Sequence, residues 1–308
     1  MFDTIIIGGG PAGISAGVYA ARKKMNALIL AESLGGSSAV SATIENWIGI
    51  ETMSGWELAQ SLERHLRAQS GIEIVTGSKA ERIEETENGY VVSAGENRYE
   101  TRTVIVASGV RHRHLDVPGE EEFRGKGVVY CSTCDAPFFR EKRVAVVGGG
   151  NSGLEAVEDL LPYASEIVLL SNTDTLSGDP VIQDRVLASE KVSVIYSADT
   201  EAILGESRVT GLRYEDLPSG EKRELKLDGV FVEIGMIPNT ECVEGFLERN
   251  ERGEIVVDPR SMAASRAGVF AAGDVTDMPY RQNNIAAGQG AVAALSAYDY
   301  VRHMGAKD

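Results

Sequence analysis

A short apolar run that ends in glycines opens the chain. Residues 4–7 read Thr-Ile-Ile-Ile and lead into glycines at 8–10, and an alanine-rich segment at 11–24 precedes a second apolar run at 27–30. Uninterrupted apolar runs of this length are typical of strands that are buried on both faces of a parallel sheet. The pattern predicts a strand–helix–strand unit.

The same order of apolar and glycine positions recurs in the middle of the chain. Residues 144–147 read Val-Ala-Val-Val and lead into glycines at 148–150, a helix-like segment follows at 152–161, and residues 167–170 form another apolar run. Two such units predict an α/β fold with two Rossmann-like, doubly wound domains.

The remaining apolar segments suggest how the two domains are connected. A strand is expected at 104–109 and another at 229–235, and an alanine-rich helix at 284–300. A chain of 308 residues exceeds the usual size of one core.

Connectors are expected at Val117-Pro118-Gly119 and near Ile237-Pro238-Asn239. We expect the second domain to be inserted into the first, with residues 1–116 and 243–308 in one domain and residues 117–242 in the other.

The charge balance disfavours several classes of partner. The chain carries 30 basic and 46 acidic residues, which gives a net charge of −16. A surface of this sign argues against binding to nucleic acids or anionic membranes. No stretch approaches the roughly 18 apolar residues of a membrane helix, and the N-terminus has no positively charged signal region. We therefore expect a cytoplasmic protein.

The first glycine cluster has the spacing of a dinucleotide-binding loop, Gly8-Gly9-Gly10-Pro11-Ala12-Gly13. Gly8 permits a tight turn, Gly10 lets the backbone approach a pyrophosphate, and Gly13 lets the helix pack closely on the strand. The N-terminus of that helix attracts phosphate. Glu32 ends the next strand, where a carboxylate can bind ribose hydroxyls.

The second glycine cluster repeats this spacing, with Gly148, Gly150 and Gly153 in the three roles. The strand that follows it ends at Leu170, and the next residues, 171–177, begin with Ser171 and contain neither lysine nor arginine. A 2′-phosphate needs cationic partners at this place, and a 2′-hydroxyl is usually bound by an acidic residue. A loop that is kept only for packing is the alternative interpretation.

A Cys-x-x-Cys pair precedes the second glycine loop. Cys131 and Cys134 enclose Ser132-Thr133, and Asp135 follows directly. A close cysteine pair in a reducing compartment indicates redox or metal chemistry. The neighbouring carboxylate could exchange protons during thiol–disulfide chemistry, which favours a redox dithiol.

Two alternatives exist for the pair. A zinc site would need further ligands, for which His112 and His114 are the nearby candidates. A purely structural disulfide would be unexpected in a cytoplasm. We expect no bound metal, and we expect Cys242, the third cysteine, to be a buried thiol without a role.

These motifs together resemble the low-molecular-weight thioredoxin reductase family, FAD-dependent pyridine nucleotide-disulfide oxidoreductases. The likeness covers nearly the whole chain. In motif detail it is greatest to the flavoprotein component of alkyl hydroperoxide reductase, which carries an additional N-terminal thioredoxin-like portion. The resemblance rests on the two glycine loops and on Ile44-Glu45-Asn46-Trp47, Ala107-Ser108-Gly109, Cys131-Ser132-Thr133-Cys134-Asp135, Ala272-Gly273-Asp274 and Arg281-Gln282.

The resemblance implies FAD in the domain that is built from both ends of the chain. Asn46, Arg281 and Gln282 would lie near the flavin, and Asp274 near the ribityl and pyrophosphate groups. Ser37 stands where the family often has glutamine. The other residues expected to bind FAD are Gly8, Gly10, Pro11, Ala12, Gly13, Glu32, Ala107, Gly109 and Gly273.

The nicotinamide site departs from the family. Members specific for NADPH carry a His-Arg-Arg cluster where this chain has Ser171-Asn172-Thr173. Each charge-assisted hydrogen bond to the phosphate contributes about 1.5–3 kcal/mol, so NADPH is disfavoured. NADH is preferred, with Gly148, Gly150, Asn151, Ser152, Gly153 and Ser171 as its expected contacts. A ferredoxin or a reduced deazaflavin is the alternative donor.

By the same resemblance, Cys134 would face the flavin, Cys131 would attack a disulfide of a separate thioredoxin- or glutaredoxin-like protein, and Asp135 would manage protons. A rotation between the domains and a homodimer are also implied. The competing hypothesis is a flavin-bearing redox sensor without turnover. A ferredoxin–NADP reductase is disfavoured because it would not need the dithiol.

Overall fold

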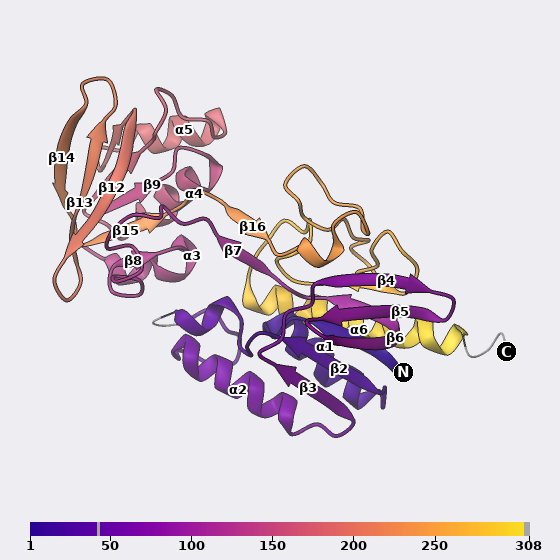
Figure 1. The fold of residues 1–308 in the computed structure, drawn as a ribbon. Coiled ribbons are helices and arrows are strands. Elements are labelled where there is room, and N and C mark those ends of the chain that lie inside the picture. Colours follow the sequence, from indigo (N-terminus) through magenta and orange to yellow (C-terminus); the bar gives the residue numbers. More distant parts are fainter. Residues whose placement is uncertain (42–43, 305–308) are drawn as a thin grey trace. The chain divides into compact units, whose positions relative to one another are not determined.

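The structure is a computed structural model that describes residues 1–41 and 44–304. The chain forms two compact units, Met1–Arg111 with Ile237–Asp308 (unit 1) and His112–Met236 (unit 2), so the second unit is inserted into the first (Figure 1). The predicted fold class is confirmed. The boundaries fall at 111/112 and 236/237, a few residues before the expected 116/117 and 242/243. The two connecting strands, β7 (Val110–His112) and β16 (Met236–Pro238), pair with each other.

Unit 1 is built on a seven-stranded sheet in the order β3-β2-β1-β6-β5-β4, with β17 also paired to β6. The strands β3, β2, β1, β6 and β17 are parallel, and β4 and β5 form an antiparallel extension. The elements of unit 1 are β1 (Phe2–Ile7), α1 (Pro11–Arg22), β2 (Ala27–Ala31), η1 (Ser37–Val40), α2 (Gly55–Arg67), β3 (Ile72–Thr76), β4 (Arg82–Thr86), β5 (Gly89–Ala94), β6 (Asn97–Val106), η3 (Glu241–Val243), β17 (Val269–Ala271) and α6 (Asn283–Met304).

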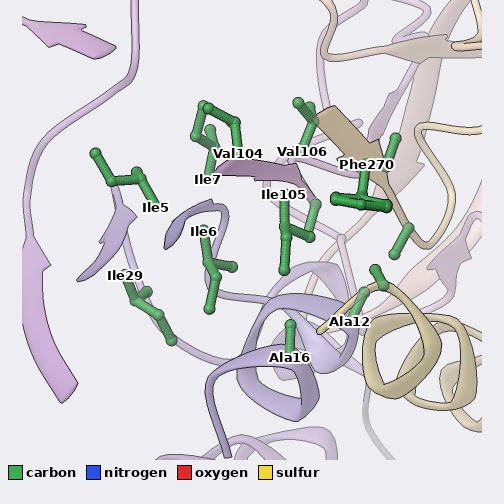
Figure 2. Close-up of a cluster of buried hydrophobic side chains, with 14 of the residues drawn as sticks. Ile5, Ile6, Ile7, Ala12, Ala16, Ile29, Val104, Ile105, Val106 and Phe270 are labelled. Carbon is green, nitrogen blue, oxygen red and sulfur yellow. The ribbon is translucent and has the colours of Figure 1, made fainter. Parts of the chain in front are cut away.

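The core of unit 1 lies on both faces of this sheet. In Figure 2, Ile6 and Ile105 point toward α1, whereas Ile7 and Val104 point to the opposite face. This alternation is the ordinary consequence of strand geometry, and it explains why the central strands are apolar at every position.

The helices α1 and α6 pack side by side in unit 1. Their backbones approach closely, because a Cβ at Gly290 of α6 would lie 2.0 Å from the carbonyl oxygen of Ala12 in α1. Small side chains on α1 permit this approach. They also let α1 pack closely on the sheet, toward which Ala16 points in Figure 2.

Unit 2 contains a parallel sheet in the order β11-β10-β9-β15-β8 and a separate antiparallel sheet, β12-β13-β14. Its elements are β8 (Val128–Val129), α3 (Ser132–Asp135), η2 (Ala136–Phe139), β9 (Arg143–Val147), α4 (Asn151–Leu160), β10 (Glu166–Leu170), α5 (Pro180–Leu187), β11 (Val192–Ile195), β12 (Ala198–Gly205), β13 (Val209–Asp216), β14 (Glu221–Lys226) and β15 (Gly229–Val232). No helix among the described residues is long and apolar enough to cross a bilayer.

The contact between α1 and α6 generates a stability prediction. Gly290→Ala should lower the free energy of unfolding by about 1–3 kcal/mol, because the added methyl group collides with the Ala12 carbonyl. Gly288→Ala, on the same helix, is the matched control. Apart from its chain neighbours and the backbone of its own helix, no described atom lies within 4 Å of its Cβ position, so this variant should gain up to about 1 kcal/mol of helix propensity. Urea denaturation of both variants measures the difference, and equal stabilities would contradict the close approach.

Candidate functional site

The glycines of the first loop divide into two kinds. Gly8 has a φ of +117°, and a Cβ there would lie 2.1 Å from the carbonyl oxygen of Ala107. A Cβ at Gly13 would lie 2.0 Å from the carbonyl oxygen of Gly8. At Gly10, by contrast, the nearest described atom is the Cα of Gly36, at 3.7 Å. The protein's own packing therefore requires Gly8 and Gly13, whereas the absence of a side chain at Gly10 leaves space for a ligand.

The second loop has the same division. Gly148 has a φ of +134°, and its Cβ would lie 2.2 Å from the carbonyl oxygen of Glu233. A Cβ at Gly153 would lie 1.7 Å from the carbonyl oxygen of Gly148, whereas the nearest described atom at Gly150 is the Oγ of Ser177, at 3.7 Å. Gly150 thus opens the same space in unit 2 that Gly10 opens in unit 1.

The helices that follow the two loops begin without caps. Within the described chain, no side chain caps α1 after Gly10 or α4 after Gly150. Two other helices differ: Ser54 caps α2 by accepting from the Glu57 N–H at 3.2 Å, and Asp179 caps α5 by accepting from the Val181 N–H at 2.7 Å. Free N–H groups beside an open glycine suit a pyrophosphate, so these residues fit a dinucleotide at each loop.

Backbone register shows which residue of unit 2 corresponds to Glu32 of unit 1. The Gly8 N–H donates to Leu30 O at 2.9 Å, and the Gly148 N–H donates to Leu170 O at 3.0 Å. Two residues after these leucines stand Glu32 in unit 1 and Asn172 in unit 2, and both side chains are exposed. The structural counterpart of Glu32 is therefore Asn172, and not Ser171, which the sequence pattern indicated.

Ser171, the residue expected to contact the donor nucleotide, points inward. Its side chain is buried, and its hydroxyl lies 2.9 Å from the Thr173 hydroxyl and donates to the Thr175 carbonyl at 3.2 Å. Asn151 also stabilises this segment, because its Oδ1 accepts from the Asp179 N–H at 2.7 Å. Both side chains hold the loop 171–179 in place.

The structure brings together several residues expected at the flavin end of unit 1. Asn46 Nδ2 donates to Gln282 Oε1 at 3.1 Å, and Asn284 donates to the Asn46 carbonyl at 2.7 Å. Arg281 pairs with Glu254. Gly109 has a φ of +65° and follows β6.

Two buried polar groups lie near Gly273 in the same unit. Burial raises the pKa of Asp274, and the charge of Arg281 opposes this shift. Gln289 Oε1 accepts from the Gly273 N–H at 2.8 Å, and its buried Nε2 has no partner among the described residues. A buried donor without an acceptor suits a polar cofactor, and Gln289 lies outside the motifs that the sequence shows.

Cys131 and Cys134 form a disulfide, with their Cα atoms 5.3 Å apart. The second cysteine and Asp135 lie in α3, a helix of four residues. Asp135 is buried, and this burial raises its carboxyl pKa to about 6. A carboxyl group with that pKa can both accept and release a proton near neutral pH.

Carboxylates from other elements surround this turn. Asp159 of α4 accepts from the Ser132 hydroxyl at 2.8 Å and from the Thr133 hydroxyl at 3.1 Å. Burial raises the pKa of Glu233 to about 8, and Asp159 and Glu155 add to the shift while a hydrogen bond from the Ser132 N–H opposes it. These residues lie far from the cysteines in sequence, and motif matching could not connect them.

The two histidines considered as zinc ligands pack on an aromatic ring. The rings of His112 and His114 lie 5.1 and 5.5 Å from that of Tyr130, whose hydroxyl donates to Glu120 at 2.7 Å. In the described parts of the chain, no three or more histidine, cysteine, aspartate or glutamate side chains form a candidate metal site.

Cys242 is buried, which raises the pKa of its thiol to about 11 and disfavours the reactive thiolate.

Comparison with known proteins identifies similar sequences and structures. A family model described as pyridine nucleotide-disulphide oxidoreductase matches residues 2–294. The chain is 44% identical to an NADH dehydrogenase of Bacillus subtilis (strain 168) and 44% identical to one of the subunits of alkyl hydroperoxide reductase in Pseudomonas putida. Each match covers 97% of this chain and 58% of the relative, so the chain spans less than two thirds of these curated relatives.

A solved structure matches over its full length. The thioredoxin reductase from Streptococcus pyogenes MGAS5005 is 35% identical and superposes with a TM-score of 0.92, covering 98% of this chain and 99% of that one. The likeness extends over both units.

The difference between Gly10 and Gly13 can be tested. The backbone of Gly10 is extended (φ −78°), so Gly10→Val should fold but lose bound flavin, because the side chain fills the open space. Gly13→Val should instead destabilise the fold, since its Cβ meets the Gly8 carbonyl. Flavin absorbance after purification and urea denaturation separate the two effects. Full flavin occupancy in a folded Gly10→Val variant would contradict the assignment.

Proposed function

The chain belongs to the pyridine nucleotide-disulphide oxidoreductase family, and from this we propose that it is a flavoprotein disulfide reductase with a thioredoxin reductase-like relay. Electrons would pass from a reduced donor through FAD to the Cys131–Cys134 disulfide, and from there to the disulfide of a small thioredoxin- or glutaredoxin-like protein. The observation that carries the proposal is the disulfide itself, which lies beside a buried carboxyl group in the unit that also holds the second glycine loop.

The first glycine loop would hold FAD. Gly10 leaves room for the pyrophosphate, the uncapped start of α1 offers N–H donors, and Glu32 is exposed at the ribose position. FAD, when bound, supplies two-electron transfer between a hydride donor and a disulfide. Asn46 and Gln282 are proposed to contact its ring, and Asp274 with Gln289 to hold its polar chain.

The output step is thiol–disulfide exchange. Cys131 as a thiolate would attack one sulfur of the partner's disulfide, forming a mixed disulfide and releasing one partner thiolate. Cys134 would then attack Cys131 sulfur, which releases the second partner thiolate and restores the Cys131–Cys134 bond. Asp135 would accept the Cys134 proton in this step and later return it, and its pKa of about 6 suits both directions.

The second glycine loop is proposed to bind NADH in preference to NADPH. Asn172 occupies the ribose position with an uncharged side chain, and residues 171–177 include no lysine or arginine. A 2′-phosphate would therefore lack the cationic partners that it needs. The name of the Bacillus subtilis relative, an NADH dehydrogenase, agrees with this preference.

Anaerobic bleaching of the flavin tests the donor. We expect NADH to reduce the flavin at concentrations at least about 100-fold lower than NADPH, because two lost charge-assisted hydrogen bonds contribute about 1.5 kcal/mol or more each. The absorbance of oxidised flavin reports the reaction. Asn172→Arg should improve NADPH and leave the flavin spectrum unchanged. Equal use of both nucleotides would contradict the NADH preference.

Other outcomes of the same titration separate the alternatives. Bleaching by a reduced ferredoxin or deazaflavin, with neither nicotinamide active, would replace NADH as the donor. Failure with every donor would favour a redox sensor over an enzyme.

Cysteine substitution tests the relay. Cys134→Ser should abolish reduction of a thioredoxin disulfide and leave the flavin bound and reducible, because the serine variant cannot form the internal disulfide. Cys242→Ser is the matched control, since its thiol is buried and takes no part in the relay. NADH-dependent reduction of thioredoxin, followed by free-thiol formation, measures both. A fully active Cys134→Ser variant would overturn the relay.

A further inference from the structure

The helical turn between the two cysteines has few stabilising interactions of its own. It belongs to α3, which spans only Ser132–Asp135, and no described side chain caps this helix at its N-cap residue, Cys131. A single helical turn is unstable by itself, because its residues lose conformational freedom for few hydrogen bonds. Besides the disulfide, contacts with other elements must therefore hold its geometry.

Asp159 supplies such contacts from α4. One of its oxygens, Oδ2, accepts the hydroxyl hydrogens of both residues that lie between the cysteines, Ser132 at 2.8 Å and Thr133 at 3.1 Å. Hydrogen bonds to a charged acceptor are stronger than those between neutral groups. The two bonds join the whole Cys-x-x-Cys turn to one carboxylate.

The helix that carries Asp159 is rigidly placed. Its residues Val157 and Leu160 are completely buried in the core of unit 2, and α4 begins directly after the second glycine loop. Asp159 therefore connects the dithiol turn to the same helix whose N-terminus faces the proposed nucleotide. The proposed relay uses Cys131, Cys134 and Asp135, and Asp159 has no part in its chemical steps.

We propose that Asp159 is a positioning residue: through Ser132 and Thr133 it holds the turn in the closed geometry of the disulfide, and it thereby lowers the reduction potential of the Cys131–Cys134 pair. This inference deepens the proposed function and rests on it. A turn that keeps the two sulfurs facing each other raises the effective concentration of one thiol at the other, which favours the disulfide over the dithiol. A pair with a low potential is a stronger reductant of the partner's disulfide.

The redox equilibrium can be measured with dithiothreitol. Reduced dithiothreitol gives two electrons and two protons to the pair, so that the Cys131–Cys134 bond breaks, two thiols form, and dithiothreitol closes to its cyclic disulfide. The flavin-loaded protein is equilibrated with defined ratios of reduced to oxidised dithiothreitol at pH 7, quenched with acid and alkylated. Trypsin releases residues 127–140, which contain both cysteines and exclude Cys242, so mass spectrometry reports this pair alone.

We expect Asp159→Ala to be half-reduced at a dithiothreitol ratio about tenfold lower than the wild type, a shift of about 30 mV to less negative potential. Ser132→Ala/Thr133→Val removes the same two hydrogen bonds and keeps the carboxylate, and it should shift the ratio by a similar factor. Asp159→Asn keeps an oxygen acceptor and should stay within about threefold of the wild type. Asp199→Ala removes an exposed carboxylate on β12 and should change nothing.

The outcomes separate this inference from the proposed function. If the Ser132→Ala/Thr133→Val variant is half-reduced at the same dithiothreitol ratio as the wild type, the positioning role is overturned. It is also overturned if Asp159→Asn and Asp159→Ala are half-reduced at the same ratio, since charge alone would then account for the shift. A wild-type pair that never equilibrates with dithiothreitol would instead contradict the relay. The double variant also provides the test if Asp159→Ala does not fold.

Discussion

The structure depends on close contacts between backbone carbonyls and glycines. At these glycines a Cβ would have no room. Such a contact occurs at Gly8 against Ala107, and again at Gly13 against Gly8 itself. Only a residue without a side chain lets β1 turn directly into α1 while α1 stays in contact with the sheet. The N-terminus of α1 consequently opens at the carboxyl ends of the parallel strands, where its N–H groups are free.

The same constraint organises the second unit, and there it also shapes the surroundings of the dithiol. Gly148 lies against the carbonyl of Glu233, and the helix that starts beyond it carries Asp159 to the cysteine turn. Glu233 therefore connects both parts of the unit: its backbone packs against Gly148 of the second glycine loop, and the Ser132 backbone lowers the pKa of its carboxyl group, which burial raises. Nucleotide loop and disulfide are parts of one packed arrangement within unit 2.

Local sequence patterns predicted the parts of the fold that local physics decides. The apolar runs at 4–7 and 144–147 became β1 and β9, and the glycine loops after them became the starts of α1 and α4. The antiparallel sheet β12-β13-β14 was not predicted, because β14 is mostly exposed and charged and shows no apolar run. The domain boundaries of the structure differ by a few residues from those expected. Pairing of β7 with β16 sets where the connectors lie, and no local pattern reveals this pairing.

The sequence by itself determined the chemistry that is available to this protein: two dinucleotide loops, a Cys-x-x-Cys pair and an adjacent acid, each a short segment whose residues act together because they are neighbours along the chain. Only the tertiary structure decided which side chains face these segments. It turned Ser171 inward and placed Asn172 at the position that corresponds to Glu32, and it brought Asp159 to Ser132 and Thr133. The physical reason is that strand register and helix packing set these contacts, and both depend on residues that are distant in sequence.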